Sequence, residues 1–78
     1  MRTTIINELK IGDRLADTEP SKYGYYTNRI ISEIVITKSG RYKIKHTFTY
    51  VYDGESDKAG ETEFSDGALK GNYPVTLF

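Results

Sequence analysis

His46 is the single histidine of the 78-residue chain and the first candidate for proton transfer. A histidine works as a general base when an orienting acid and a nucleophile lie beside it, and the sequence offers no arrangement of that kind. The other role of a lone histidine is structural, with a ring nitrogen bonded to a hydroxyl or to a backbone carbonyl. We therefore interpret His46 as a structural residue, and we expect no catalytic centre, no cofactor and no enzyme activity.

A second candidate for chemistry is the acidic stretch over residues 53–66, which carries six carboxylates against one base, Lys58. Carboxylate oxygens bind divalent cations. The order of residues nevertheless differs from that of a calcium loop, because Gly54 falls too early and Ser56 follows Glu55. The chain has no cysteine, which excludes disulfides and zinc sites with thiolate ligands. We expect residues 53–60 to form a solvated acidic loop without a metal.

Three cations at alternating positions make the strongest binding candidate, since Arg41, Lys43 and Lys45 would project from the same side of a strand. Cations follow a phosphate backbone while aromatic rings stack on bases, and two tyrosines and an arginine lie nearby in the sequence. The candidate binding residues are Tyr25, Tyr26, Arg29, Arg41, Lys43 and Lys45. The competing interpretation is a solvated strand face on which Glu33 neutralises one lysine and the lysines oppose aggregation.

These cations belong to residues 41–52, whose even positions are apolar, aromatic or histidine and whose odd positions are mostly cations and threonines. That alternation is typical of a long strand with one buried and one solvated face. A second strand is expected at residues 30–37, so the two segments predict a long hairpin over residues 30–52.

The loop between these strands decides which side chains face each other. A three-residue loop at residues 38–40 brings the large apolar groups together and places Gly40 in the left-handed position of a bulged turn. A two-residue loop would instead put Ile34 and Ile36 among the lysines. The predicted pairs are Ile36 with Tyr42, Ile34 with Ile44, Glu33 with Lys45, Ser32 with His46, and Ile30 with Phe48.

The rest of the chain predicts shorter elements separated by loops. We expect an irregular or single-turn lead-in at residues 1–10, although threonine and isoleucine also favour a strand there. Pro20 and Gly24 predict a loop over residues 17–26. Further expected elements are short strands at residues 61–64 and 75–78 and one helical or 3₁₀ turn within residues 65–71.

About five strands and little helix predict an all-β fold, with residues 1–78 forming one small domain. The entry segment LKIGDRL, with Gly12 and Asp13, is followed by a long loop, a strong hairpin and short strands. This order of elements resembles SH3-like small β-barrels. The resemblance implies a partly open barrel and transfers no functional residue. An OB-like barrel and a small α+β sheet with a helical N-terminal segment are the alternatives.

The balance of charge limits the classes of partner. Eleven basic and eleven acidic residues cancel, so no overall charge draws the protein to nucleic acid or to an anionic membrane. No segment approaches the roughly 20 apolar residues of a membrane span, and the first residues lack the apolar run of a signal peptide. We expect a cytoplasmic protein without a membrane partner.

Small size, many tyrosines and the lack of a catalytic constellation favour a non-enzymatic binding module that docks on a macromolecule, foremost a protein. Nucleic-acid binding by the face of Arg41, Lys43 and Lys45 is the alternative function. The residue usage is rich in Ile, Lys, Tyr, Thr and Asn, as in proteins of AT-rich genomes, and favours a phage or bacterial accessory protein such as an inhibitor. An exposed strand edge at residues 75–78 would also allow a homo-oligomer.

Overall fold

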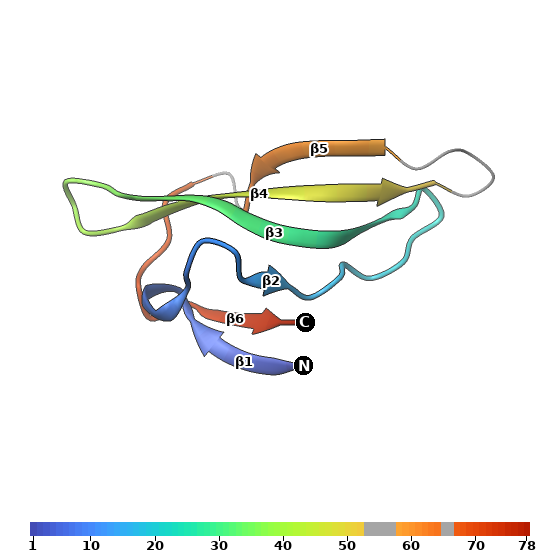
Figure 1. Ribbon diagram of the computed structural model, residues 1–78. Helices are drawn as coiled ribbons and strands as arrows, with labels where there is room; N and C mark the ends of the chain where they lie inside the picture. Colours follow the sequence, from blue (N-terminus) through green and yellow to red (C-terminus); the bar gives the residue numbers. More distant parts are fainter. Residues whose placement is uncertain (53–57, 65–66) are drawn as a thin grey trace.

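The computed structural model of the chain describes residues 1–52, 58–64 and 67–78. Within them, six strands form one antiparallel sheet in the order β1-β6-β2-β3-β4-β5 (Figure 1). The strands are β1 (Arg2–Ile5), β2 (Arg14–Leu15), β3 (Tyr25–Ile36), β4 (Tyr42–Val51), β5 (Lys58–Glu63) and β6 (Pro74–Leu77). The sheet bends so that β1, β2 and β6 lie below β3, β4 and β5 in Figure 1.

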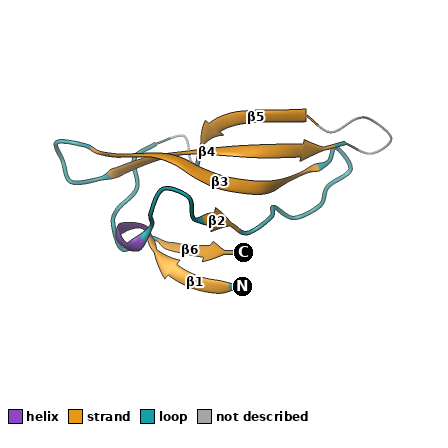
Figure 2. Cartoon of the chain, viewed as in Figure 1, coloured by secondary structure: helices purple, strands orange, loops and turns teal. Residues whose placement is uncertain are grey.

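The predicted all-β class is confirmed. The helical content of the described residues is a single 3₁₀ turn, η1 (Ile6–Glu8), at the purple coil of Figure 2. Strands β1 and β5 are the two edges of the sheet, so the described sheet does not close into a barrel. The N-terminal lead-in contains the expected single turn, but Arg2–Ile5 before it forms a paired strand, which corrects the prediction of irregular structure there.

The turn of the central hairpin agrees with the sequence prediction. Gly40 has φ +80°, and Thr37 and Arg41 close the three-residue loop through a hydrogen bond of 2.7 Å. The pairs Ile36–Tyr42, Ile34–Ile44 and Glu33–Lys45 form as predicted. Only glycine adopts such a left-handed backbone at little cost, so this position fixes the bulged turn and with it the register next to the turn.

Two irregularities change the register farther from the turn. One lies between Ile31 and Glu33 and the other between Thr27 and Ile30. His46 therefore lies opposite Ile31 rather than Ser32, and Ile30 lies opposite Thr47 rather than Phe48. The predicted Ser32–His46 and Ile30–Phe48 pairs are wrong, because an extra residue in one strand shifts the pairing beyond it.

The hairpin is longer at its open end than predicted. Strand β3 begins at Tyr25, so the expected loop over residues 17–26 ends two residues earlier, and the paired hairpin covers residues 25–51. The irregularity between Thr27 and Ile30 includes Asn28. The φ of Asn28 is +51°, a conformation that asparagine tolerates better than most residues. This bulge lets strand β3 continue past the end of the apolar pattern.

The C-terminal segment corrects a prediction about the edge of the sheet. Strand β6 lies between β1 and β2, so residues 75–78 are not the exposed edge that the sequence suggested. Strand β5 begins at Lys58 rather than at residue 61. Of the expected acidic loop, residues 53–57 lie outside the described residues, as do residues 65–66 of the expected 3₁₀ turn. Leu69 makes a bridge to Tyr42.

The core lies on the face of the sheet that carries Leu15, Ile31 and Ile44, which we call the inner face. Its buried apolar residues are Ile6, Leu9, Leu15, Ile31, Ile44, Val75 and Leu77. Each contributes roughly 1.5–3 kcal/mol by leaving water. Ile6 and Leu9 come from the 3₁₀ turn and its end, and the other five come from β2, β3, β4 and β6, so this cluster holds the bent sheet together. The opposite side of β3, β4 and β5, with Lys43, Lys45 and Thr47, is the outer face.

Candidate docking surface

The inner face continues beyond the core as an aromatic surface. Tyr26 lies opposite Tyr50 across the hairpin, and its ring centre is 4.7 Å from those of both Phe48 and Tyr50. Tyr52 meets Tyr50 edge-on at 4.4 Å. We call Tyr26, Phe48, Tyr50 and Tyr52 the aromatic cluster. Tyr26 is 37% exposed, and the other three rings are half-buried, so together they offer a partly solvated apolar surface.

The loop before β3 holds the cluster in place. The Tyr50 hydroxyl donates to the Tyr23 carbonyl at 3.0 Å. The Tyr26 N–H donates to Thr18 Oγ1 at 2.7 Å, and the Thr18 N–H donates back to the Tyr26 carbonyl at 3.0 Å. Rings whose rotation is already restricted lose little entropy on binding. The loop therefore holds the rings of the cluster in one arrangement.

Glycine in β5 lets the cluster reach the edge of the sheet. Gly60 lies opposite Phe48, and a Cβ added to Gly60 would be 2.8 Å from Phe48 Cζ. The ring thus packs directly over the main chain of the edge strand, in space that any other residue would fill. A glycine within a strand often marks such a close approach.

His46 and Arg29 separate the cluster from the core. His46 is 3% exposed and its Nδ1 has no partner among the described residues. Burial lowers the pKa of His46, and the positive charge of Arg29 lowers it further, so the imidazole is neutral at pH 7. Arg29 Nη1 donates to the Ala16 carbonyl at 2.8 Å. Burial lowers the pKa of Arg29, while Asp17 and Tyr26 raise it.

His46 has no catalytic partner in the described part of the chain. Its ring contact is Phe48 at 5.9 Å, and its charged neighbour is a cation. A general base needs an acid that orients it and a nucleophile within reach. The predicted contact of His46 with Ser32 is wrong, because Ser32 instead donates from Oγ to Glu61 Oε2 at 2.8 Å on the outer face.

The outer face carries Lys43 and Lys45 of the predicted basic row, Arg41, Lys43 and Lys45, but acidic residues lie beside them. Lys45 Nζ lies 3.5 Å from Glu33 Oε2 and directly opposite Glu63 of β5. Glu61 lies opposite Thr47. The row is thus a mixed-charge surface, which weakens its attraction for phosphates.

The six residues predicted as one binding site do not lie together. Lys43 and Lys45 are on the outer face near the hairpin turn, while the Arg41 guanidinium turns toward the Ala68 carbonyl at 3.5 Å. Tyr25 is opposite Val51, eight residues from Lys43 along β4, which corresponds to about 27 Å. Tyr26 and Arg29 are on the inner face.

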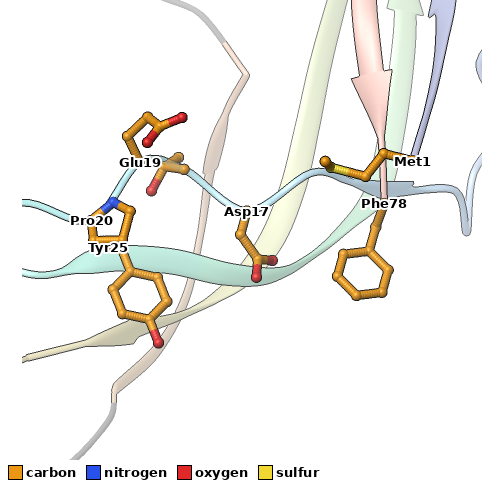
Figure 3. Close-up of a pocket in the computed structure, with 7 residues that line it drawn as sticks. Met1, Asp17, Glu19, Pro20, Tyr25 and Phe78 are labelled. Atoms are coloured by element: carbon orange, nitrogen blue, oxygen red, sulfur yellow. The ribbon is translucent and has the colours of Figure 1, made fainter.

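A shallow hollow of about 370 Å³ lies beside Tyr25 (Figure 3). Its lining residues are Met1, Asp17, Thr18, Glu19, Pro20, Tyr25 and Phe78. The Asp17 carboxylate accepts from Thr27 Oγ1 at 2.9 Å and lies 3.7 Å from Arg14 Nη2. Arg14 also covers the Phe78 ring at 3.7 Å. The Asp17 carboxylate in the hollow is thus already engaged by Thr27 and Arg14.

Neither a metal site nor a membrane-spanning helix is found in the described residues. No group of three or more His, Asp or Glu side chains there is placed to hold a metal ion. None of the helical structure in residues 1–52, 58–64 and 67–78 is long and apolar enough to cross a membrane. Comparison of the chain with known protein families, with curated proteins and with solved structures finds no match.

The candidate binding residues predicted from the sequence include Tyr26 but not the rings around it. Phe48, Tyr50 and Tyr52 were assigned to the buried face because of their spacing. The available signal was length, since residues 41–52 span about 40 Å as a strand, whereas the other predicted strands are too short to cover that length. The end of residues 41–52 that the other strands are too short to cover therefore stays open on the inner face.

Proposed function

We propose that this protein is a non-enzymatic binding module that docks on a protein partner through the aromatic cluster. The carrying observation is that four rings, held by the hairpin and by the loop before β3, form a partly exposed surface outside the core. Tyrosine rings in such positions dominate many protein interfaces, because they bury a large area at small entropic cost. By occupying a surface on its partner, the module would act as an accessory protein or an inhibitor.

A protein partner is favoured over nucleic acid by the charges around the cluster. Lys58 Nζ lies over the Tyr52 ring at 5.3 Å, and residues 53–57, which precede it in the sequence, carry three acids. Phosphates would meet little positive charge there. On the outer face, Glu33, Glu61 and Glu63 accompany the lysines.

Selection from a phage-displayed library of random peptides tests this function. Peptides recovered on the wild-type protein are synthesised and titrated against wild type, Tyr26→Ala and Tyr73→Ala. Tyr73 is the matched control, since it is 47% exposed and lies outside the cluster. We expect Tyr26→Ala to weaken binding at least about tenfold, as loss of an interface anchor does, and Tyr73→Ala to leave it unchanged.

Two outcomes contradict the proposal. One is that the selected peptides bind Tyr26→Ala, folded by circular dichroism, as tightly as they bind wild type. The other is that a single-stranded oligonucleotide binds at physiological salt and loses its affinity in the variant with both Lys43→Glu and Lys45→Glu, which would establish the outer face as a nucleic-acid site.

A further inference from the structure

Among the described residues, strand β5 is the longer open edge of the sheet. It contains six residues, all exposed, whereas the opposite edge, β1, contains four. The sequence of β5, KAGETE, has no proline, and only one lysine stands on it. Prolines, lysines and short length are the usual means by which an edge is protected from pairing.

The hydrogen-bond pattern shows which main-chain groups of β5 are open. The Phe64 N–H donates to the Ile44 carbonyl at 2.7 Å, and this pair continues the register of β4 with β5. Hydrogen-bonded pairs alternate with open pairs in an antiparallel ladder, so the even residues of β5 bond to β4. Ala59, Glu61 and Glu63 therefore direct their N–H and C=O groups away from the sheet.

The two faces of this edge differ in chemistry. On the inner face, Gly60 has no side chain to cover the Phe48 ring at the edge of the sheet. A side chain of an added strand opposite Gly60 would therefore pack on this ring. On the outer face, Glu61 and Glu63 stand at the edge, with Lys45 and Glu33 one and two strands behind them. An added strand would thus meet an aromatic surface on one side and carboxylates on the other.

We propose that β5 accepts an extended segment of the partner protein as a seventh strand, and that this segment alternates basic with apolar residues. The basic side chains lie opposite Glu61 and Glu63, and the apolar side chains extend the aromatic cluster past Gly60. Main-chain bonds supply affinity in this mode, and the alternating side chains supply specificity. The inference rests on the proposed function and adds the mode of docking and the chemistry of the partner.

A second copy of this chain fits the edge poorly. The ladder rule requires odd residues of one copy to lie opposite odd residues of the other. In every such antiparallel register, Glu61 of one copy lies opposite or diagonal to a carboxylate of the other. Like charges at these positions destabilise a strand pair, so the acidic edge favours a basic partner over self-pairing at neutral pH.

The test uses an eight-residue peptide that alternates lysine with valine, and a control peptide that alternates glutamate with valine. We expect the lysine peptide to bind and to slow hydrogen exchange at the N–H groups of Ala59, Glu61 and Glu63. The Glu61→Lys variant should bind it about two- to thirtyfold more weakly, since one cross-strand charge pair turns from attraction to repulsion. Glu19→Lys, the same change outside the edge, should bind as wild type does.

The outcomes separate this inference from the proposed function. The strand-addition inference fails if the lysine peptide binds without slowing exchange at the three odd residues, if it does not bind, or if the glutamate peptide binds equally well. It also fails if the protein sediments as a dimer at neutral pH and the N–H groups of Ala59, Glu61 and Glu63 are already protected without peptide. The proposed function stands or fails separately, on whether library peptides depend on Tyr26. A Glu61→Pro variant, which removes an outward N–H together with the Glu61 carboxylate, should also abolish the protection.

Discussion

Replacement of Gly24 by alanine gives the sharpest test of how the loop before β3 supports the aromatic cluster. Gly24 has φ +126° and exchanges hydrogen bonds of 3.1 Å with Ser21 in both directions. A Cβ at this position would lie well inside contact of the Val51 carbonyl oxygen and 3.1 Å from Tyr50 Cζ. Alanine therefore meets both an unfavourable backbone conformation and atoms of β4.

The expected loss of stability follows from these two terms. A non-glycine residue in such a conformation costs about 1–3 kcal/mol, and forcing extra atoms into a filled space costs about 1–3 kcal/mol more. Gly40 is the matched control, because its φ is +80° but a Cβ would meet no atom within 4 Å. Gly40→Ala should cost about 1–2 kcal/mol, so Gly24→Ala should be less stable than Gly40→Ala by at least about 1 kcal/mol.

Urea denaturation followed by tyrosine fluorescence measures both variants, since the chain has seven tyrosines and no tryptophan. A domain of this size is stable by about 4–12 kcal/mol, so the expected difference is well resolved. Equal free energies of unfolding for Gly24→Ala and Gly40→Ala would refute the reasoning, because the contact with Val51 and Tyr50 would then contribute nothing.

Three further predictions concern the core, a buried histidine and the acidic edge. Leu15→Ala should lower the free energy of unfolding by about 2–5 kcal/mol, because Leu15 is fully buried where β2 meets β3 and β6; a loss below 1 kcal/mol in urea denaturation would contradict this. The pKa of His46 is lowered from 6.5 in the folded state, so the unfolded chain takes up the proton first as the pH falls. The free energy of unfolding of wild type should therefore fall relative to that of His46→Leu as the pH falls below about 6.5, and the two should depend on pH alike above it. Urea titrations of both proteins at several pH values measure this. A difference in free energy of unfolding that stays the same at all pH values would be evidence against a buried neutral imidazole. Finally, replacing Glu61 and Glu63 by glutamine removes the like charges between two edges, so sedimentation at pH 7 should show more self-association of the variant with both Glu61→Gln and Glu63→Gln than of wild type; equal self-association of the two proteins would contradict the role given to these charges.

The sequence predicts the hairpin turn well because its determinants are local. Gly40 has to be left-handed, and the count of large apolar pairs distinguishes one register from the other over the first few residues. Farther away, Ser32 turns to the outer face and bonds to Glu61, 29 positions along the chain. A bulge that depends on so distant a partner leaves no mark in the local pattern of residues 30–37.

The arrangement of the short strands is also invisible in the sequence. Strand β6 pairs with β1 from the other end of the chain, and four-residue segments have too little periodicity to reveal such a pairing. The site was missed for a related reason. The aromatic residues of β4 have the spacing of core residues, and only the short length of the covering strands leaves Tyr26, Phe48 and Tyr50 partly open.

The most direct test of docking through the aromatic cluster is an aromatic ¹H–¹³C NMR titration of the protein with a peptide selected from the random library. We predict that the ring resonances of Tyr26, Phe48 and Tyr50 move together with one dissociation constant, while the ring of Tyr73 stays unchanged. Movement of Tyr73 without the three cluster rings, or a response confined to the side chains of Lys43 and Lys45, would contradict the proposed docking surface.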